Sequence, residues 1–125
     1  MLASRVHHVS FPIADLARAR DFYEGVLGLA PIARPAMGIQ GVWYRAGDTE
    51  VHLIVTPPGH EVGARPPKLT PLGPHTAFAI DDYAETLAAL RAKGVEVLET
   101  SAQAGQMWIR DPDGNVFELI APRRG

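Results

Sequence analysis

The chain has 125 residues, of which 46% are hydrophobic and 21% are charged, a composition typical of one small globular domain. The formal net charge is -2 and no stripe of lysine and arginine occurs, which argues against nucleic acid as a partner. The apolar runs are too short to span a bilayer, which argues against a membrane protein. The absence of cysteine excludes disulfides, thiolate metal ligands and cysteine nucleophiles, and we expect a cytoplasmic location.

The N-terminal half has the pattern of a strand, a helix and three further strands. We expect the first strand over Val6–Ile13 and the helix over Leu16–Leu27, where apolar residues follow a helical period. Asp15 is a suitable N-cap and Gly28 a suitable residue to end the helix. The three strands that follow are expected near Pro31–Arg34, Gly41–Ala46 and Glu50–Val55.

A proline- and glycine-rich stretch separates this half from the next. Residues 56–74 hold six prolines and three glycines, so we expect neither a helix nor a central strand there. We interpret residues 57–73 as a linker. Arg65 and Lys68 within it could meet an anionic substrate, although a stiff solvated connector is the simpler interpretation.

The second half repeats the order of the first. A strand is expected over His75–Ile80 and a helix over Tyr83–Lys93, with Asp82 as its N-cap and Gly94 at its end. Three strands should follow near Val95–Thr100, Gln106–Arg110 and Val116–Ala121. We therefore predict a single domain over 1–125, made of two modules, 1–56 and 74–122, that arise from an internal repeat.

Strand alternation selects four residues as candidate metal ligands. His8 and His52 face away from the apolar side of the first module, and His75 and Glu118 do so in the second module. The members of the two pairs occupy corresponding positions of the repeat. Three imidazoles and one carboxylate suit a divalent ion such as Zn²⁺, Ni²⁺, Mn²⁺, Co²⁺ or Fe²⁺. A buried glutamate also needs a partner, because an unpaired buried charge is costly.

Other polar and aromatic residues near these strands give weaker evidence for a site. His7 fails the alternation test and His60 lies in the linker, so we expect neither to bind metal. Alternation places Trp43 and Trp108 on one face of their strands and Tyr44 on the other. The sequence leaves open which of these faces carries a site.

Several segments resemble the vicinal-oxygen-chelate superfamily, which includes glyoxalase I, extradiol dioxygenases, fosfomycin-resistance thiol transferases, methylmalonyl-CoA epimerase and bleomycin-binding proteins. The segments are Val6–Val9, Asp15–Leu29, Pro74–Phe78 and Asp111–Leu119. The Asp-Pro-Asp-Gly-Asn run that begins at Asp111 is the most specific of these motifs. The resemblance implies an α+β fold of paired βαβββ modules, whose eight strands form a cupped mixed sheet with the helices on its outer face.

The resemblance also implies that His8, His52, His75 and Glu118 bind one divalent metal ion, and that Glu118 acts as the general base. Such an enzyme would be a lyase or isomerase of glyoxalase type, acting on a small oxygen-rich molecule chelated by the metal. One departure is His52, where glyoxalase I commonly has a carboxylate.

Three other functions fit the same resemblance. An extradiol dioxygenase would use Fe²⁺ with His8, His75 and Glu118. A non-catalytic antibiotic-binding protein would need no metal, and a fosfomycin thiol transferase is a further alternative. We also expect a homodimer, because the open sheet leaves strand edges that a second chain can cover.

Overall fold

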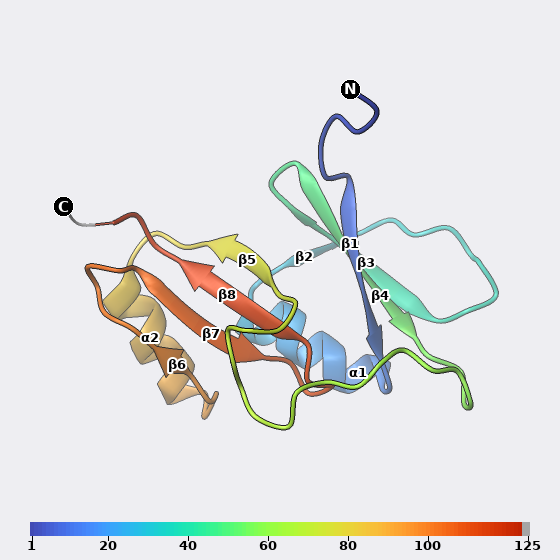
Figure 1. Ribbon diagram of the computed structural model, residues 1–125. Coiled ribbons are helices and arrows are strands. Elements are labelled where there is room, and N and C mark those ends of the chain that lie inside the picture. The colour runs from blue at the N-terminus through green and yellow to red at the C-terminus, as the bar shows by residue number, and fades with distance from the viewer. Residues whose placement is uncertain (124–125) are drawn as a thin grey trace. The chain divides into compact units, whose positions relative to one another are not determined.

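Paired βαβββ modules make up the chain, as expected. The computed structural model describes residues 1–123. The chain divides into two compact units, of which the first spans Met1–Gly63 and the second begins at Ala64. Each unit contains a four-stranded mixed sheet, so the eight expected strands are present as two sets of four (Figure 1). Residues 57–73 form neither helix nor strand.

The first unit has the strand order β1-β4-β3-β2. β1 runs parallel to β4, and the other two pairs are antiparallel. The pairing sets Ser10 beside His52 on one side and Trp43 beside His52 on the other. The strands are β1 (His8–Ile13), β2 (Ala30–Ile32), β3 (Gly41–Ala46) and β4 (Thr49–Val55).

The helix of the first unit differs from the regular α-helix expected over Leu16–Leu27. Only α1 (Leu16–Arg20) is α-helical, and η1 (Asp21–Val26) continues it as a π-helix. The wider turn is visible in the backbone, where the N–H of Leu27 donates to the carbonyl of Phe22, five residues earlier. Asp15 caps α1 as predicted, since its side chain accepts a backbone N–H of the first turn.

The second unit repeats this topology with the order β5-β8-β7-β6. β5 runs parallel to β8, and the remaining pairs are antiparallel. β5 and β6 are shorter than expected, so His75 lies immediately before its strand rather than within it. Asp82 caps α2 as predicted. The elements are β5 (Thr76–Ala79), α2 (Tyr83–Ala92), β6 (Leu98–Glu99), β7 (Gln106–Arg110) and β8 (Val116–Ile120).

Each unit buries one face of its sheet. In the first unit, Tyr23 of η1 stacks on Tyr44 of β3 with ring centroids 6.0 Å apart, and both side chains are fully buried. The helical segment therefore covers the face that carries Tyr44. Because side chains alternate along a strand, Trp43 and His52 lie on the opposite face. In the second unit, the buried side chains include Met107, Ile109, Phe117 and Leu119.

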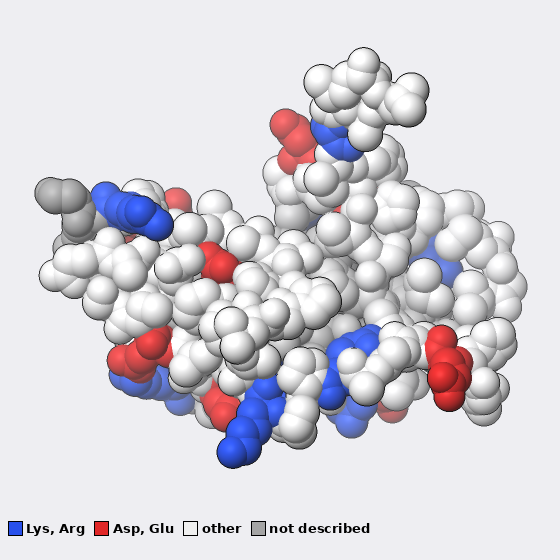
Figure 2. All heavy atoms as spheres, in the orientation of Figure 1, with Lys and Arg blue, Asp and Glu red and all other residues white. Residues whose placement is uncertain are grey.

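Charged side chains are mixed over the visible surface. In the view of Figure 2, lysine and arginine lie among aspartate and glutamate rather than gathering by sign. Within residues 1–123, no helix has the length and apolar character needed to cross a membrane.

Candidate metal centre

His8 and His52 come together on the exposed face of the first sheet. Their rings stack with centroids 4.1 Å apart and planes 16° apart. The indole of Trp43 stacks on His52 as well, at 4.1 Å and 6°. The imidazole of His52 is thus held between two rings and is only 7% exposed. The prediction that these two histidines share one face is confirmed, and the face that the sequence left open is the one that carries Trp43.

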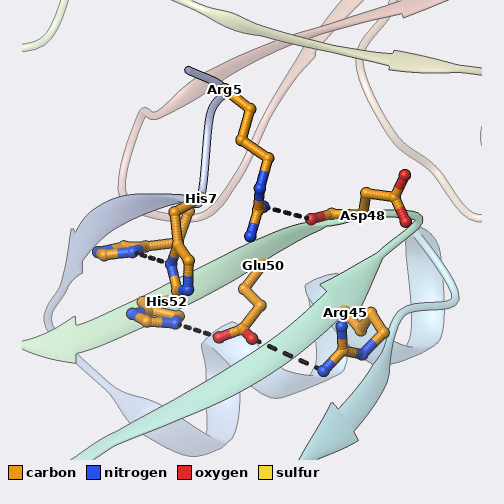
Figure 3. Close-up of polar contacts among 7 residues, drawn as sticks. Arg5, His7, Arg45, Asp48, Glu50 and His52 are labelled. Atoms are coloured by element: carbon orange, nitrogen blue, oxygen red, sulfur yellow. Dashed lines mark hydrogen bonds and ion pairs between the residues drawn. The ribbon is translucent and has the colours of Figure 1, made fainter. Parts of the chain in front are cut away.

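Glu50 fixes the orientation of the His52 ring. Its Oε1 atom lies 2.9 Å from Nε2 of His52, and its Oε2 atom lies 3.6 Å from the guanidinium of Arg45 (Figure 3). An N–H on Nε2 donates to this carboxylate, which leaves the lone pair of His52 on Nδ1. The hydrogen bond from His52 lowers the pKa of Glu50, and the charges of His7 and Arg45 act in the same direction. Sequence reasoning missed Glu50, although it lies two residues before His52 and so shares its face.

His8 has a second imidazole neighbour. Nδ1 of His8 lies 2.9 Å from Nδ1 of His7. Burial lowers the pKa of His8, and the nearby His52 and His7 lower it further. A lowered pKa favours the neutral imidazole, which is the form that can bind a metal ion.

His75 and Glu118 come together in the second unit. Nε2 of His75 lies 3.1 Å from Oε1 of Glu118, and Nδ1 of His75 lies 3.0 Å from the backbone carbonyl of Gly73. A carbonyl only accepts, so Nδ1 carries a hydrogen. Nε2 then faces a carboxylate oxygen, and the contact requires either a proton or a cation between the two atoms. A backbone carbonyl behind a histidine and a carboxylate beside it are typical surroundings of a metal-binding imidazole.

Two side chains of β7 complete the surroundings of Glu118. Nε2 of Gln106 donates to Oε2 of Glu118 at 3.1 Å. Trp108 pairs directly with Glu118 in the strand register, and its ring meets the ring of His75 edge-on at 6.5 Å. Glu118 is 7% exposed, and both of its carboxylate oxygens have partners. Sequence reasoning placed Trp108 near the site but missed Gln106.

The Asp-Pro-Asp-Gly-Asn turn sets the start of β8. Asp111 is 4% exposed, and its Oδ1 atom accepts the backbone N–H groups of Asp113 and Asn115 at 2.9 and 2.8 Å. Gly114 has a φ of 87°, a value that favours glycine. Arg65 of the connector packs on Gly114 and donates from Nε to Oδ1 of Asn115 at 3.0 Å. The turn therefore fixes the register that brings Glu118 beside His75.

The four predicted ligands thus form two pairs, one in each unit. The donor chemistry of both pairs fits a divalent cation, because each offers a nitrogen or oxygen lone pair on a polar face of a sheet. Within residues 1–123, no group of three or more histidine, aspartate, glutamate or cysteine side chains gathers in a way that could hold a metal ion. The four-residue ligand set stays a prediction.

Comparisons with known proteins identify the family. Residues 5–119 match the model of the Glyoxalase/Bleomycin resistance protein/Dioxygenase superfamily. A relative named Glyoxylase I 4, from Arabidopsis thaliana, is 28% identical over 91% of this chain and 68% of its own length. The mitochondrial methylmalonyl-CoA epimerase of Bos taurus is 28% identical over 81% of this chain, and this chain covers 61% of that protein.

A solved structure has the same fold. TnmS3, an antibiotic-binding protein from Streptomyces sp. CB03234, superposes with a TM-score of 0.74. It is 26% identical in sequence, and the match covers 98% of each chain. Together with the paired βαβββ modules and the family match over most of its length, this shows that the chain belongs to the Glyoxalase/Bleomycin resistance protein/Dioxygenase superfamily.

Proposed function

We propose that this protein is a divalent-metal-dependent enzyme of glyoxalase type, a lyase or isomerase that acts on a small oxygen-rich substrate. His8, His52, His75 and Glu118 are the proposed ligands. The proposal rests above all on the contact between Nε2 of His75 and Oε1 of Glu118, because that contact needs a proton or a cation between its two atoms. The similarity to a glyoxylase I and to an epimerase supports the choice of reaction class.

The residues around Glu118 suit it to moving a proton. A divalent ion, when bound, would supply a Lewis acid that polarises a substrate carbonyl and makes the neighbouring C–H or O–H group more acidic. Glu118 would accept that proton on a carboxylate oxygen and return it to the product. Gln106 holds the other oxygen of the carboxylate, so the general base keeps one orientation. The carbonyl of Gly73 keeps His75 in the tautomer that leaves Nε2 as the ligand atom.

The first unit would contribute orientation rather than proton transfer. Its two proposed ligands are imidazoles, which supply no negative charge, and Glu50 lies behind His52. This composition is the departure from glyoxalase I noted in the sequence, where a carboxylate commonly replaces His52. We therefore place the general base in the second unit.

Metal analysis of protein purified without chelator tests the proposal. The expected result is stoichiometric zinc, nickel, manganese or cobalt, with turnover of a hemithioacetal in a panel that also contains catechols and fosfomycin. Stoichiometric iron with ring cleavage of a catechol would assign the extradiol dioxygenase instead. Turnover of fosfomycin with a thiol would assign the transferase.

A non-catalytic antibiotic-binding protein is the second candidate, and two observations favour it. TnmS3 shares the fold at 26% identity, and the stacked rings of Trp43, His52 and His8 form an aromatic cluster on one face of the first sheet. Bleomycin binding by metal-free protein, without turnover of any substrate in the panel after metal addition, would support this function. Turnover on metal addition would exclude it as the sole function.

We also propose a homodimer. β1, β2, β5 and β6 are the outer strands of their sheets, and their outer edges present backbone groups that a second copy could pair with or cover. Sedimentation equilibrium at micromolar concentration should return twice the mass of one chain. A mass near that of one chain would reject the dimer.

A further inference from the structure

The indole N–H of Trp108 is a buried donor without an acceptor. Trp108 is 8% exposed, and its Nε1 atom has no hydrogen-bond partner among residues 1–123. A buried donor that loses its water partner and gains no other is costly, and native structures rarely leave one without a reason. The indole N–H can only donate, so the missing partner must be an acceptor.

The position of Trp108 indicates where that acceptor belongs. Trp108 of β7 is the direct cross-strand neighbour of Glu118 of β8, so the two side chains lie on the same face of the sheet. The ring of His75 meets the indole edge-on on this face. A ligand that approaches the carboxylate of Glu118 therefore also approaches the indole of Trp108.

The neighbouring carboxylate is not the missing partner. Oε1 of Glu118 is paired with His75 and Oε2 with Gln106, and no contact with Nε1 of Trp108 accompanies them. The carboxylate of Glu118, the proposed general base, and the indole N–H of Trp108 beside it are thus both in place before a ligand binds. This arrangement suits recognition of an oxygen atom on the ligand.

We propose that Nε1–H of Trp108 donates a hydrogen bond to a substrate oxygen and is a specificity-determining contact of this protein. The acceptor would be a carboxylate, carbonyl or enolate oxygen of the molecule on which Glu118 acts. A site built to donate to an oxygen rejects analogues that lack it, because the buried donor is then left unpaired. This inference rests on the proposed metal-dependent function.

The two tryptophans of the chain make the proposal directly measurable. The protein contains only Trp43 and Trp108, so its ¹⁵N–¹H spectrum has two indole resonances, and Trp108→Phe identifies one of them. Trp43, whose indole stacks on the proposed ligand His52, gives the second resonance, with which the Trp108 shift is compared. Oxalate and catechol, which each carry two adjacent oxygens, are the probes, added to zinc-loaded protein.

The expected result is a downfield shift of the Trp108 indole proton on addition of a probe, larger than the shift of Trp43. Calorimetry should show at least about tenfold weaker binding of that probe to Trp108→Phe, the value expected for loss of one hydrogen bond to a charged oxygen. Zinc binding, titrated first in the same cell, should be retained in the variant.

Three outcomes would overturn the inference. One is an unmoved Trp108 resonance while a probe binds, and another is equal probe affinity in Trp108→Phe. The third is zinc-loaded protein that binds neither probe, because the ligand class would then be wrong. Failure of the wild-type chain to bind zinc in the first titration would instead reject the proposed function itself, so the two failures are distinguishable.

Discussion

The two pairs of proposed ligands occupy corresponding positions of a repeated module, but their surroundings differ. In the first unit, His52 lies between the rings of Trp43 and His8 and is tied to Glu50. In the second unit, His75 and Glu118 face each other directly at 3.1 Å. The first pair is satisfied by ring stacking and a carboxylate behind it, whereas the second pair has its ligand atoms pointed at each other.

Because of this difference, the two halves of the repeat can contribute differently to a metal site. A stacked imidazole with a fixed tautomer is already oriented for binding. As a ligand, however, the ring adds no negative charge to a cation site. A carboxylate beside an imidazole nitrogen supplies both charge and a proton acceptor. We therefore expect the second unit to carry most of the metal affinity and the acid–base chemistry, and the first unit to refine them.

The largest effect is expected from the pair in the second unit. His75→Ala or Glu118→Ala should reduce zinc affinity by more than about 100-fold, because each would remove a proposed ligand rather than a group behind one. Circular dichroism should remain that of the wild type. Isothermal titration with zinc measures the affinity, and Glu118→Gln, which keeps the size of the side chain, should behave as Glu118→Ala does.

His60→Ala is the matched control for these variants. His60 is an exposed histidine of the connector, outside both pairs, and its loss should leave zinc affinity unchanged. Stoichiometric zinc retained by His75→Ala or Glu118→Ala would remove that residue from the site. It would also contradict the expectation that the second unit contributes more to metal affinity than the first.

The sequence predicted the strands well where alternation and turn residues agreed. Gly41–Ala46 and Gln106–Arg110 have the expected bounds, since each strand pairs with a neighbour across a short turn. The π-helical η1 was not predictable, because apolar spacing does not distinguish a wide turn from a regular one over six residues. The start of β5 was missed by one residue, which moved His75 out of the strand.

Strand alternation predicted only part of the candidate site. Alternation placed His8 with His52, and the repeat pointed to His75 and Glu118. Gln106 and Glu50, which hydrogen-bond to Glu118 and His52, were not found, because alternation gives the face on which a side chain lies but not its partner. The cross-strand register places Gln106 opposite Ile120 and Glu50 opposite His8, so their partners follow only from the side-chain hydrogen bonds.

Glu50 allows a sharper test of the first unit. Glu50→Gln keeps an acceptor for Nε2 of His52 but removes the negative charge, so zinc affinity should fall by about tenfold, the lower end for a group behind a ligand. Zinc titration measures the change, and the exposed connector variant Glu61→Gln is the charge-matched control. An unchanged affinity in Glu50→Gln would mean that His52 is not a ligand through Nδ1 or that its orientation is set by ring stacking alone.

The smallest expected effects compare one buried tyrosine from each unit. The hydroxyl of Tyr44 donates to Oε2 of Glu24 at 2.8 Å, whereas the hydroxyl of Tyr83 accepts the backbone N–H of Thr100 at 2.9 Å. Tyr44→Phe should lower the free energy of unfolding by about 1.5 kcal/mol, since the lost bond has a charged partner. Tyr83→Phe should cost only about 0.5 kcal/mol, because the N–H of Thr100 also reaches the carbonyl of Gln106.

The pH dependence of the free energy of unfolding distinguishes the causes of the stability loss in these two variants. The hydrogen bond from Arg20, followed by that from Tyr44, lowers the pKa of Glu24, while burial and Glu24 raise the pKa of Tyr44. A carboxyl whose pKa is lower in the folded state stabilises the fold above its unfolded pKa, and this contribution is lost as the pH falls through its folded pKa. Urea unfolding should therefore show a Tyr44→Phe deficit that is full at pH 7 and shrinks below the unfolded pKa of glutamate, near pH 4. The Tyr83→Phe deficit should not change with pH, and a constant deficit in Tyr44→Phe would mean that the Glu24 contact contributes nothing to stability.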